Sequence, residues 1–479
     1  SDPDYAAKQW NLWDAYGVGF GSSANVGASR IDGGDGAVVA VVDTGLTSHP
    51  DLASRLAPGY DFVSDPTALR GVREAGAANV PFDGDYVDES AYGALGWDPN
   101  PSDPGDWSAA RSSSWHGTKV AGVIAAEPNN ATGVAGLAPK ATVVPVRALS
   151  WRGGLLSDVI AGITWASGGA VEGVPVNANP ADVINMSFAV QSQCTRGLQD
   201  AIDAARTRGS LLVAAAGNAN DDVANYAPAN CGNVIAVGAT GRDGKRAAYS
   251  NWGVGIDVAA PGGSLVADGG VWTTSNAGAT IAGDPLTASA EGTSIAAAHV
   301  SGVAALAAAS DQTATPDQLT LRLTGKAGVR SFADNTCDPD PTRSCGAGIV
   351  SIATAPTVTS LNVTSGTAAG GTATVITGTG FSTTPGDNTV KFGGVTATVT
   401  AASATSLSVT SPSRLDSART VGAVPVTVEV GGQTSNNTVY FTFRPVIDLT
   451  LHTASQTTKV NLGALASQSQ GKAITRATS

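Results

Sequence analysis

The 479-residue sequence has little charge: Asp, Glu, Lys and Arg make up 14% of it, and the formal net charge is −12. An acidic chain is a poor ligand for nucleic acid or an anionic membrane, so we expect neither as its main partner. Polar or charged residues interrupt every apolar run before the roughly 18 residues that a membrane span needs. Hydrophobic residues make up 42% of the chain, which allows large cores and excludes general disorder. The length predicts two to four domains.

Cysteine is scarce: the sequence has four, and they indicate which disulfides can form and in which cellular compartment the protein works. They allow three connectivities, of which the local pairs Cys194–Cys231 and Cys337–Cys345 fit the spacing. Disulfides point to a compartment outside the cytoplasm. Because no signal peptide stands at Ser1, we expect either a cytosolic protein or a processed mature chain, and the cysteines favour secretion.

Apolar runs alternate with helical stretches over the first 353 residues. The runs predict buried strands at 35–48, 141–149, 181–188, 209–218 and 233–240. The stretches at 117–126, 156–167 and 196–209 predict helices between them. Alternation of this kind predicts an α/β domain with a mainly parallel sheet, in which polar residues at the carboxyl ends of strands form the site.

The composition changes near residue 354. Short runs rich in Thr, Val and Ser alternate with Gly, Pro and Asn every 8–12 residues, which predicts an all-β sandwich. The predicted organisation is therefore an α/β domain at 1–353, a sandwich at 354–445 and a polar tail at 446–479.

The stretch EGTSIAAAHV places Ser294 at the start of an Ala-rich helix. A helix start offers free N–H groups and the positive end of a dipole, so a serine there is either an N-cap or a nucleophile. Asp43 closes an apolar strand, where a buried carboxylate needs a partner such as a protonated imidazole. With His116 these residues make an orienting acid, a base and a nucleophile. Asn218, which opens a loop after another strand, could supply an oxyanion donor.

Four blocks, VVDTG, HGTKVAG, AAAGN and EGTSIAAAHVSG, resemble in order and spacing the signatures of the subtilisin-like serine proteases. The resemblance covers about residues 1–353 and implies a three-layer fold. It also implies a secreted endopeptidase that uses an Asp43–His116–Ser294 triad, with Asn218 in the oxyanion hole. Residues 355–444 resemble an IPT/TIG immunoglobulin-like module. This module could attach the enzyme to an insoluble protein or a cell surface, or act only as a spacer, and we expect attachment.

The resemblance also implies where substrate binds. Protein or peptide substrates would lie as an added strand between two edge segments. The implied contact residues are Arg152, Gly153, Gly154 and Leu156 on one edge, Ser187, Phe188 and Ala189 on the other, and Ala215, Ala216 and Gly217 along the pocket.

Calcium is the cofactor that the resemblance implies. The first predicted site uses Asp2, Asp51 and Asn130 with the carbonyls of Pro128, Thr132 and Val134; the second uses Asp257 with the carbonyls of Gly232 and Val234. Oxygen ligands of mixed type suit calcium. The acidic loops at 83–106 are either solvated or further calcium ligands.

Three departures from the family pattern concern the site. Lys119 replaces a second His, Ile295 and Ala298 replace Met and Pro near the nucleophile, and Ala189 replaces a pocket Gly. None of these changes removes a catalytic group, and we expect an active monomer. Two alternatives stay open: a binding protein that has lost activity, and a serine hydrolase that acts mainly on esters.

Overall fold

The computed structural model describes residues 2–13, 18, 33–64, 97–107, 111–150, 153–325, 328–330, 332–333, 336–352, 356–382, 385–403, 405–415, 421–430 and 433–446. The chain divides into two compact units, the first built on Ser1–Ala355 and the second on Pro356–Glu429 and Thr434–Ser479. Arg152, residues 83–96 of the acidic loops at 83–106, and nearly all of the predicted tail lie outside the described residues.

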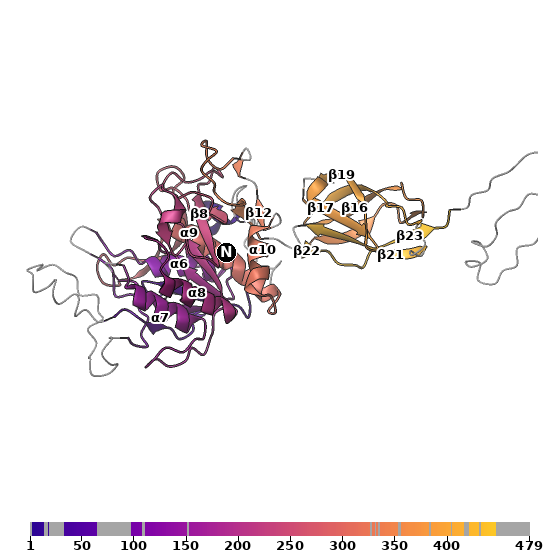
Figure 1. Ribbon diagram of the computed structural model, residues 1–479. Coiled ribbons are helices and arrows are strands. Elements are labelled where there is room, and N and C mark those ends of the chain that lie inside the picture. The colour runs from indigo at the N-terminus through magenta and orange to yellow at the C-terminus, as the bar shows by residue number, and fades with distance from the viewer. Residues whose placement is uncertain are drawn as a thin grey trace, which may run out of the picture. The chain divides into compact units, whose positions relative to one another are not determined.

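A nine-stranded sheet, in the order β12-β13-β9-β8-β6-β4-β1-β3-β2, is the centre of the first unit (Figure 1). All its neighbouring strands are parallel except β12 and β13. The strands are β1 (Val38–Asp43), β2 (Tyr60–Asp61), β3 (Thr142–Arg147), β4 (Val183–Met186), β6 (Leu211–Ala215), β8 (Val234–Thr240), β9 (Val258–Pro261), β12 (Val329–Arg330) and β13 (Ile349–Val350). The mainly parallel sheet expected from the apolar runs is therefore confirmed.

Two hydrophobic cores cover the two faces of this sheet, as strand geometry requires. Val39 and Val41 of β1 face the core formed with α6 (His116–Ala125) and α9 (Thr293–Ser310). Ala40 and Val42 face the opposite core, formed with α7 (Leu156–Ala166) and α8 (Arg196–Thr207). The result is a three-layer α/β arrangement.

Short elements complete the first unit. Helices α1 (Tyr5–Lys8) and α2 (Trp10–Trp13) precede the sheet, α10 (Pro316–Thr324) follows α9, and η1 (Val223–Asn225) follows β6. Strand β10 (Val271–Asn276) pairs antiparallel with β11 (Pro285–Ala290), and β5 (Val190–Gln191) pairs antiparallel with β7 (Tyr226–Ala227), which follows much later in the chain.

Helix α9 owes its Ala-rich sequence to its place in the core. It packs against β4, β6, β8 and β9, and small side chains let a helix approach strands closely. Among the described residues, α9 is the one helix whose length and apolar composition would allow it to cross a membrane. However, 78% of this helix is buried inside the protein.

The second unit consists of two β-sheets that enclose an aromatic core. One sheet has the order β14-β16-β20-β19 and the other β15-β23-β21-β17-β18, with β22 paired to β21. The elements are β14 (Thr357–Leu361), β15 (Ser365–Thr367), β16 (Ala373–Thr379), η3 (Pro385–Asp387), β17 (Asn388–Phe392), β18 (Val395–Thr396), β19 (Thr398–Ser403), β20 (Ser406–Thr410), β21 (Gly422–Val430), β22 (Gln433–Thr434) and β23 (Tyr440–Arg444). Phe392, Phe441 and Phe443 pack edge to face inside it.

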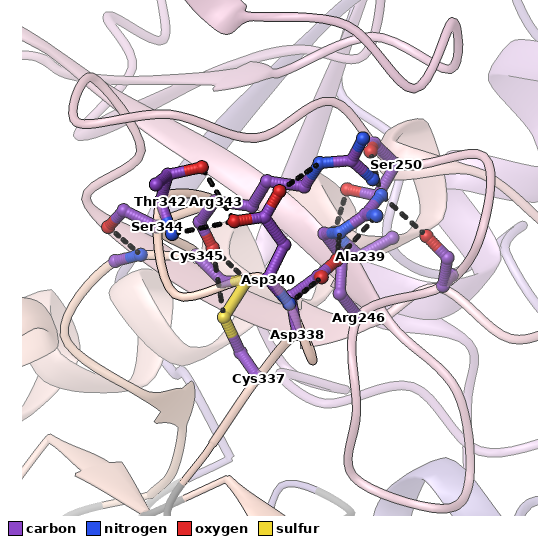
Figure 2. Close-up of a disulfide and its surroundings, with 12 residues drawn as sticks. Ala239, Arg246, Ser250, Cys337, Asp338, Asp340, Thr342, Arg343, Ser344 and Cys345 are labelled. Atoms are coloured by element: carbon purple, nitrogen blue, oxygen red, sulfur yellow. Dashed lines mark hydrogen bonds and ion pairs between the residues drawn. A yellow bond between two sulfur atoms is a disulfide. The ribbon is translucent and has the colours of Figure 1, made fainter.

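Both expected disulfides are present in the first unit. Cys194 is bonded to Cys231, and Cys337 is bonded to Cys345. The second bond closes a short loop that Figure 2 shows among several ion pairs and hydrogen bonds.

Candidate active site

Asp43 and His116 meet where β1 ends and α6 begins. The Nδ1–H of His116 donates to Asp43 Oδ1 over 2.7 Å, and the carboxylate is fully buried. A carboxylate only accepts, so this contact places the imidazole proton on Nδ1 and leaves Nε2 free to accept another. Burial alone would lower the pKa of His116, but the charge and hydrogen bond of Asp43 outweigh it and raise that pKa above 6.5.

Gly117 allows the two chain segments to come this close. A Cβ built on Gly117 would lie 2.2 Å from the carbonyl oxygen of Gly45 and 3.3 Å from the Cβ of Asp43. The Gly117 N–H donates to Thr44 Oγ1 over 3.1 Å. The glycine of the HGT motif is therefore a packing requirement of the Asp43–His116 pair.

Ser294 lies in the first turn of α9 and does not cap it. Its hydroxyl donates to the carbonyl of Ser187, and the Ser187 hydroxyl donates to the carbonyl of Ser294, both over 2.7 Å. The N-cap residue is Gly292, which has no side chain to serve as a cap. The cap interpretation of Ser294 is thus wrong, and its hydroxyl must leave the Ser187 carbonyl before it can donate to another group.

Asn218, in the loop that follows β6, supplies the missing cap. Its Oδ1 accepts the backbone N–H of Thr293 over 2.9 Å and the Thr293 hydroxyl over 2.8 Å. These contacts fix the amide plane. A Cβ built on Gly292 would lie 3.3 Å from Asn218 Nδ2 and 3.7 Å from the backbone nitrogen of Ser294. Two nitrogen donors therefore border the same small space beside Gly292.

The predicted pocket residues lie next to these groups. Ala215 and Ala216 are buried at the end of β6, and the Gly217 N–H donates to Thr293 Oγ1 over 3.0 Å. A Cβ on Gly217 would be 3.4 Å from that of Ala189, so the two predicted walls approach each other.

The other predicted edge is more exposed. Gly153 and Gly154 are exposed, Leu156 is 42% exposed, and Phe188 is partly buried. Gly153 pairs with Ser150 through reciprocal backbone hydrogen bonds. These residues are accessible for contact with an extended chain.

The first predicted calcium site brings two buried carboxylates to the loop at 128–134. Asp2 accepts N–H groups of this loop, and Asp51 accepts the Asn130 side-chain amide over 2.9 Å. A Cβ on Gly133 would lie 1.9 Å from Asp51 Oδ2, so the loop wraps around this carboxylate. Within the described ranges no three His, Cys, Asp or Glu side chains gather as a metal site. Two acids with amide and carbonyl oxygens nevertheless fit calcium, which takes mixed oxygen ligands.

At the second predicted calcium site the predicted ligands have protein partners. Asp257 accepts the backbone N–H of Ala236 over 2.8 Å, and the carbonyl of Gly232 accepts from Gln199 over 3.0 Å. Val234 begins β8 and pairs with Leu212. Asp257 Oδ2 and the Gly232 carbonyl thus accept from protein donors, as the carboxylates of the first site also do.

The acidic stretch at 97–106 is not solvated as one of the two expectations had it, and the other expectation, further calcium ligands, stays a prediction. Asp98, Asp103 and Asp106 are each 9% exposed or less, so they are not solvated. Asp103 accepts the Thr44 hydroxyl over 2.7 Å and the Gly105 N–H over 2.9 Å, and burial raises its pKa to about 6. These carboxylates order their own loop next to the residue that follows Asp43, a role that a loop-like sequence did not indicate.

His299 and Lys119 are the remaining titratable groups on the helices of the site. His299 is buried in α9; its Nδ1–H donates to the Ile295 carbonyl and its Nε2 accepts from Asn11, both over 2.8 Å. Burial lowers the pKa of His299 to about 4, so it is a neutral core residue. Burial also lowers the pKa of Lys119, and its charge opposes that of protonated His116.

Comparisons with known proteins agree with this geometry. The model of the subtilase family matches residues 34–348, and that of the IPT/TIG domain matches residues 356–443. The chain is 47% identical over 329 residues to an extracellular protease of Xanthomonas campestris pv. campestris, with 66% of this chain and 50% of that protein covered. It is 40% identical over 336 residues to an extracellular basic protease of Dichelobacter nodosus, with 67% and 50% covered.

A solved protease structure is also similar to this chain. A protease from Pseudoalteromonas arctica superposes with a TM-score of 0.63 at 42% identity, over 73% of this chain and 96% of that one. The chain spans about half the length of the two relatives named above. Because the subtilase model covers most of the chain, the protein belongs to the subtilase family and carries an IPT/TIG domain after the matched region.

Proposed function

We propose that this protein is an extracellular serine endopeptidase that hydrolyses peptide bonds through an acyl-enzyme. The observation that carries the proposal is the 2.7 Å contact between His116 Nδ1 and the buried Asp43, which holds the imidazole in the tautomer of a general base. Two relatives named as extracellular proteases support both the activity and the location.

In the proposed reaction the Ser294 hydroxyl turns from the Ser187 carbonyl to His116 Nε2. Ser294 Oγ attacks the peptide carbonyl while His116 takes its proton. Asp43 stabilises the imidazolium that forms. The carbonyl oxygen becomes an oxyanion, which accepts from Asn218 Nδ2 and from the backbone N–H of Ser294.

The tetrahedral intermediate then collapses. The carbon–nitrogen bond breaks, and His116 gives its proton to the leaving amine. Water enters, His116 removes its proton, and attack on the ester frees the acid and restores the Ser294 hydroxyl. Acylation and deacylation use the same oxyanion donors, Asn218 Nδ2 and the Ser294 N–H, so the same site geometry serves both steps.

Substrate recognition and attachment belong to the same proposal. An extended protein or peptide chain would lie between the Gly153–Gly154 edge and the Ser187–Ala189 edge, with the side chain before the cleaved bond against 215–217. The IPT/TIG domain would hold the enzyme on an insoluble protein or a cell surface. The enzyme would act as a monomer.

Calcium would stabilise the fold. Asp2, Asp51 and Asn130, with carbonyls of the 128–134 loop, would hold the ion, which would offset the negative charge of two buried carboxylates. A second ion at Asp257, with Gly232 and Val234, is proposed on the resemblance alone.

Labelling with a fluorophosphonate probe, followed by peptide mapping, tests the proposal. We expect label on Ser294 that is lost in His116→Ala. Ser301 is the internal control, because this serine of the same helix is buried and donates to Asn185 over 2.9 Å. If folded protein carries no label at Ser294, the proposed activity is wrong and the binding-protein alternative replaces it.

A further inference from the structure

Asn251 uses its whole side chain to hold the backbone around Asn218. It is 1% exposed, and its Nδ2 donates to the carbonyl of Ala216 over 2.8 Å. Its Oδ1 accepts the N–H of Ala219 over 3.0 Å and that of Asp221 over 3.1 Å. The bonded groups lie on both sides of Asn218, so the chain on each side of it is tied to one rigid amide.

The main chain of Asn251 adds a fourth contact to the same loop. Its N–H donates to the carbonyl of Gly217 over 2.9 Å. A Cβ on Gly217 would lie 2.4 Å from Asn251 Nδ2, so the loop packs directly on this side chain. The Asn amide carries both a donor and an acceptor at the end of the side chain, whereas the Asp carboxylate of the same length carries only acceptors. The three side-chain bonds of residue 251 therefore require an Asn at this position.

The segment that carries Asn251 is itself anchored to the loop closed by Cys337–Cys345 (Figure 2). Arg246 Nε donates to Asp338 over 2.6 Å, and each of these side chains is 7% exposed. Arg246 Nη1 also donates to the carbonyl of Ser250 over 2.6 Å. A buried, fully bonded arginine thus fixes the residue before Asn251 to the disulfide loop.

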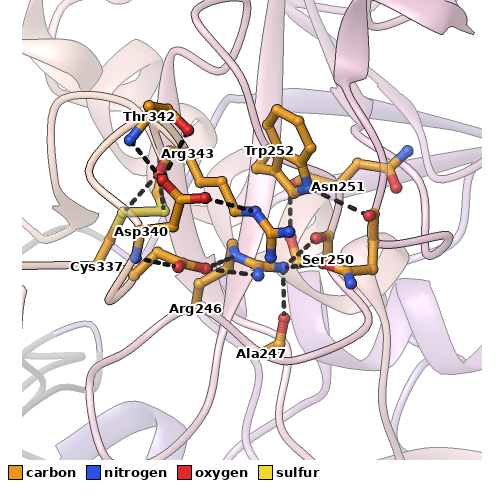
Figure 3. A network of polar contacts seen from close by, with 12 residues as sticks. Arg246, Ala247, Ser250, Asn251, Trp252, Cys337, Asp340, Thr342 and Arg343 are labelled. Atoms are coloured by element: carbon orange, nitrogen blue, oxygen red, sulfur yellow. Dashed lines mark hydrogen bonds and ion pairs between the residues drawn. A yellow bond between two sulfur atoms is a disulfide. The ribbon is translucent and has the colours of Figure 1, made fainter.

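Further contacts run between the same two segments, and Figure 3 shows Arg343 beside Trp252. The Arg343 guanidinium lies 5.1 Å from the centre of the Trp252 ring, and Trp252 Nε1 donates to the carbonyl of Asn220. The Gly253 N–H donates to the carbonyl of Ser344 over 2.9 Å. The disulfide loop therefore supports the backbone on both sides of Asn251.

We propose that Asn251 is a positioning residue that sets the place of Asn218 Nδ2 in the oxyanion hole, and that the Arg246–Asp338 pair and the Cys337–Cys345 loop hold Asn251 in turn. This inference rests on the proposed function, in which Asn218 donates to the oxyanion. Asn251 itself touches no substrate; it acts through the backbone of 216–221.

The test is a double-mutant cycle between Asn251→Asp and Asn218→Ala, read as kcat and KM on a peptide substrate. Asn251→Asp keeps the shape but removes the donor to Ala216. We expect kcat to fall by roughly 10- to 100-fold with KM nearly unchanged, because small misplacements at a reacting centre cost that much. In the Asn218→Ala background the same change should lower kcat no further.

Asn177→Asp is the matched control. Asn177 is 3% exposed, donates to the carbonyl of Ala166 over 3.1 Å and accepts the Asn179 N–H over 2.8 Å, at the end of α7. It therefore loses the same kind of bond without touching the 216–221 loop, and kcat should stay at the wild-type value.

The outcomes separate this inference from the proposed function. If Asn218→Ala leaves kcat unchanged, the proposed role of Asn218 is wrong and the inference falls with it. If Asn218→Ala lowers kcat but Asn251→Asp has no effect, or an effect that adds to it, only the inference is wrong. If Asn251→Asp does not fold, the same double-mutant cycle is measured with Asp338→Asn in its place. A smaller loss of kcat that disappears in the Asn218→Ala background supports the inference. A loss of kcat that remains in that background overturns it.

Discussion

Asn218 has two functions on one side chain, and two substitutions separate them. Oδ1 caps α9 at Thr293, and Nδ2 faces the space beside Gly292. Asn218→Ala removes both the cap and the donor. Asn218→Asp keeps an acceptor for Thr293, places a negative charge at a helix N-terminus and removes only the donor.

The two losses have different sizes. Removal of one oxyanion-hole donor lowers kcat by about 10²- to 10³-fold, the range known for such a donor in subtilisin itself. Loss of an N-cap lowers the free energy of unfolding by about 1 kcal/mol. We therefore expect Asn218→Ala to lose both activity and stability, and Asn218→Asp to lose at least as much activity at little or no cost in stability.

The assay needs kcat and stability from the same variants. Hydrolysis of a chromogenic peptide gives kcat and KM, and thermal unfolding in a Ser294→Ala background gives stability without self-digestion. KM should change little, because the donor acts on the transition state. Wild-type kcat in both variants would refute the assignment, and equal destabilisation of both would refute the capping argument.

Three further predictions follow from charges in the structure. Asp43 raises the pKa of His116, so kcat/KM should fall as His116 gains a proton on the acid side, with a midpoint above 6.5; a pH–rate profile with a midpoint below 6.5 would contradict this. Burial raises the pKa of Asp103 from 3.8 to about 6, so its contribution to the free energy of unfolding is present below about pH 4 and lost as pH rises through 6. The loss is about 3 kcal/mol, and Asp103→Asn should flatten this part of a stability–pH curve, whereas an unchanged slope would exclude Asp103 as its source. Calcium at 100 times its Kd should stabilise the protein by about 2.7 kcal/mol for each site, so chelation should lower Tm in the wild type and lower it less in Asp51→Ala, which loses the first site; equal shifts in both would place the ion elsewhere.

Local sequence patterns were sufficient for the elements of the fold. The run AVVAVVD predicted a strand, and β1 is Val38–Asp43. The helix expected at 156–167 is α7 at Leu156–Ala166. Both patterns depend on neighbours a few residues apart, so sequence alone carries them. The four signature blocks likewise identified the family before any contact between them was known.

Long-range contacts decided what the sequence left open. The capping interpretation of Ser294 was reasonable from its position, but Asn218 caps the helix from 75 residues away. Asp103 could be solvated by its sequence context, but it is buried against Thr44. These contacts join residues that lie far apart in the sequence, so a local sequence pattern cannot predict them.

The sequence by itself determined the α/β alternation, the β-sandwich pattern, the acidic balance and the residues able to do acyl-transfer chemistry, because each depends on residue type and short spacing. Only the tertiary structure showed the direct contact between His116 and Asp43 and the burial that makes His299 a neutral core residue. It also decided that an asparagine in the inconspicuous stretch YSNWG holds the backbone of 216–221. The physical reason is that hydrogen bonds act over about 3 Å, and the folded chain alone brings residues from distant blocks within that distance.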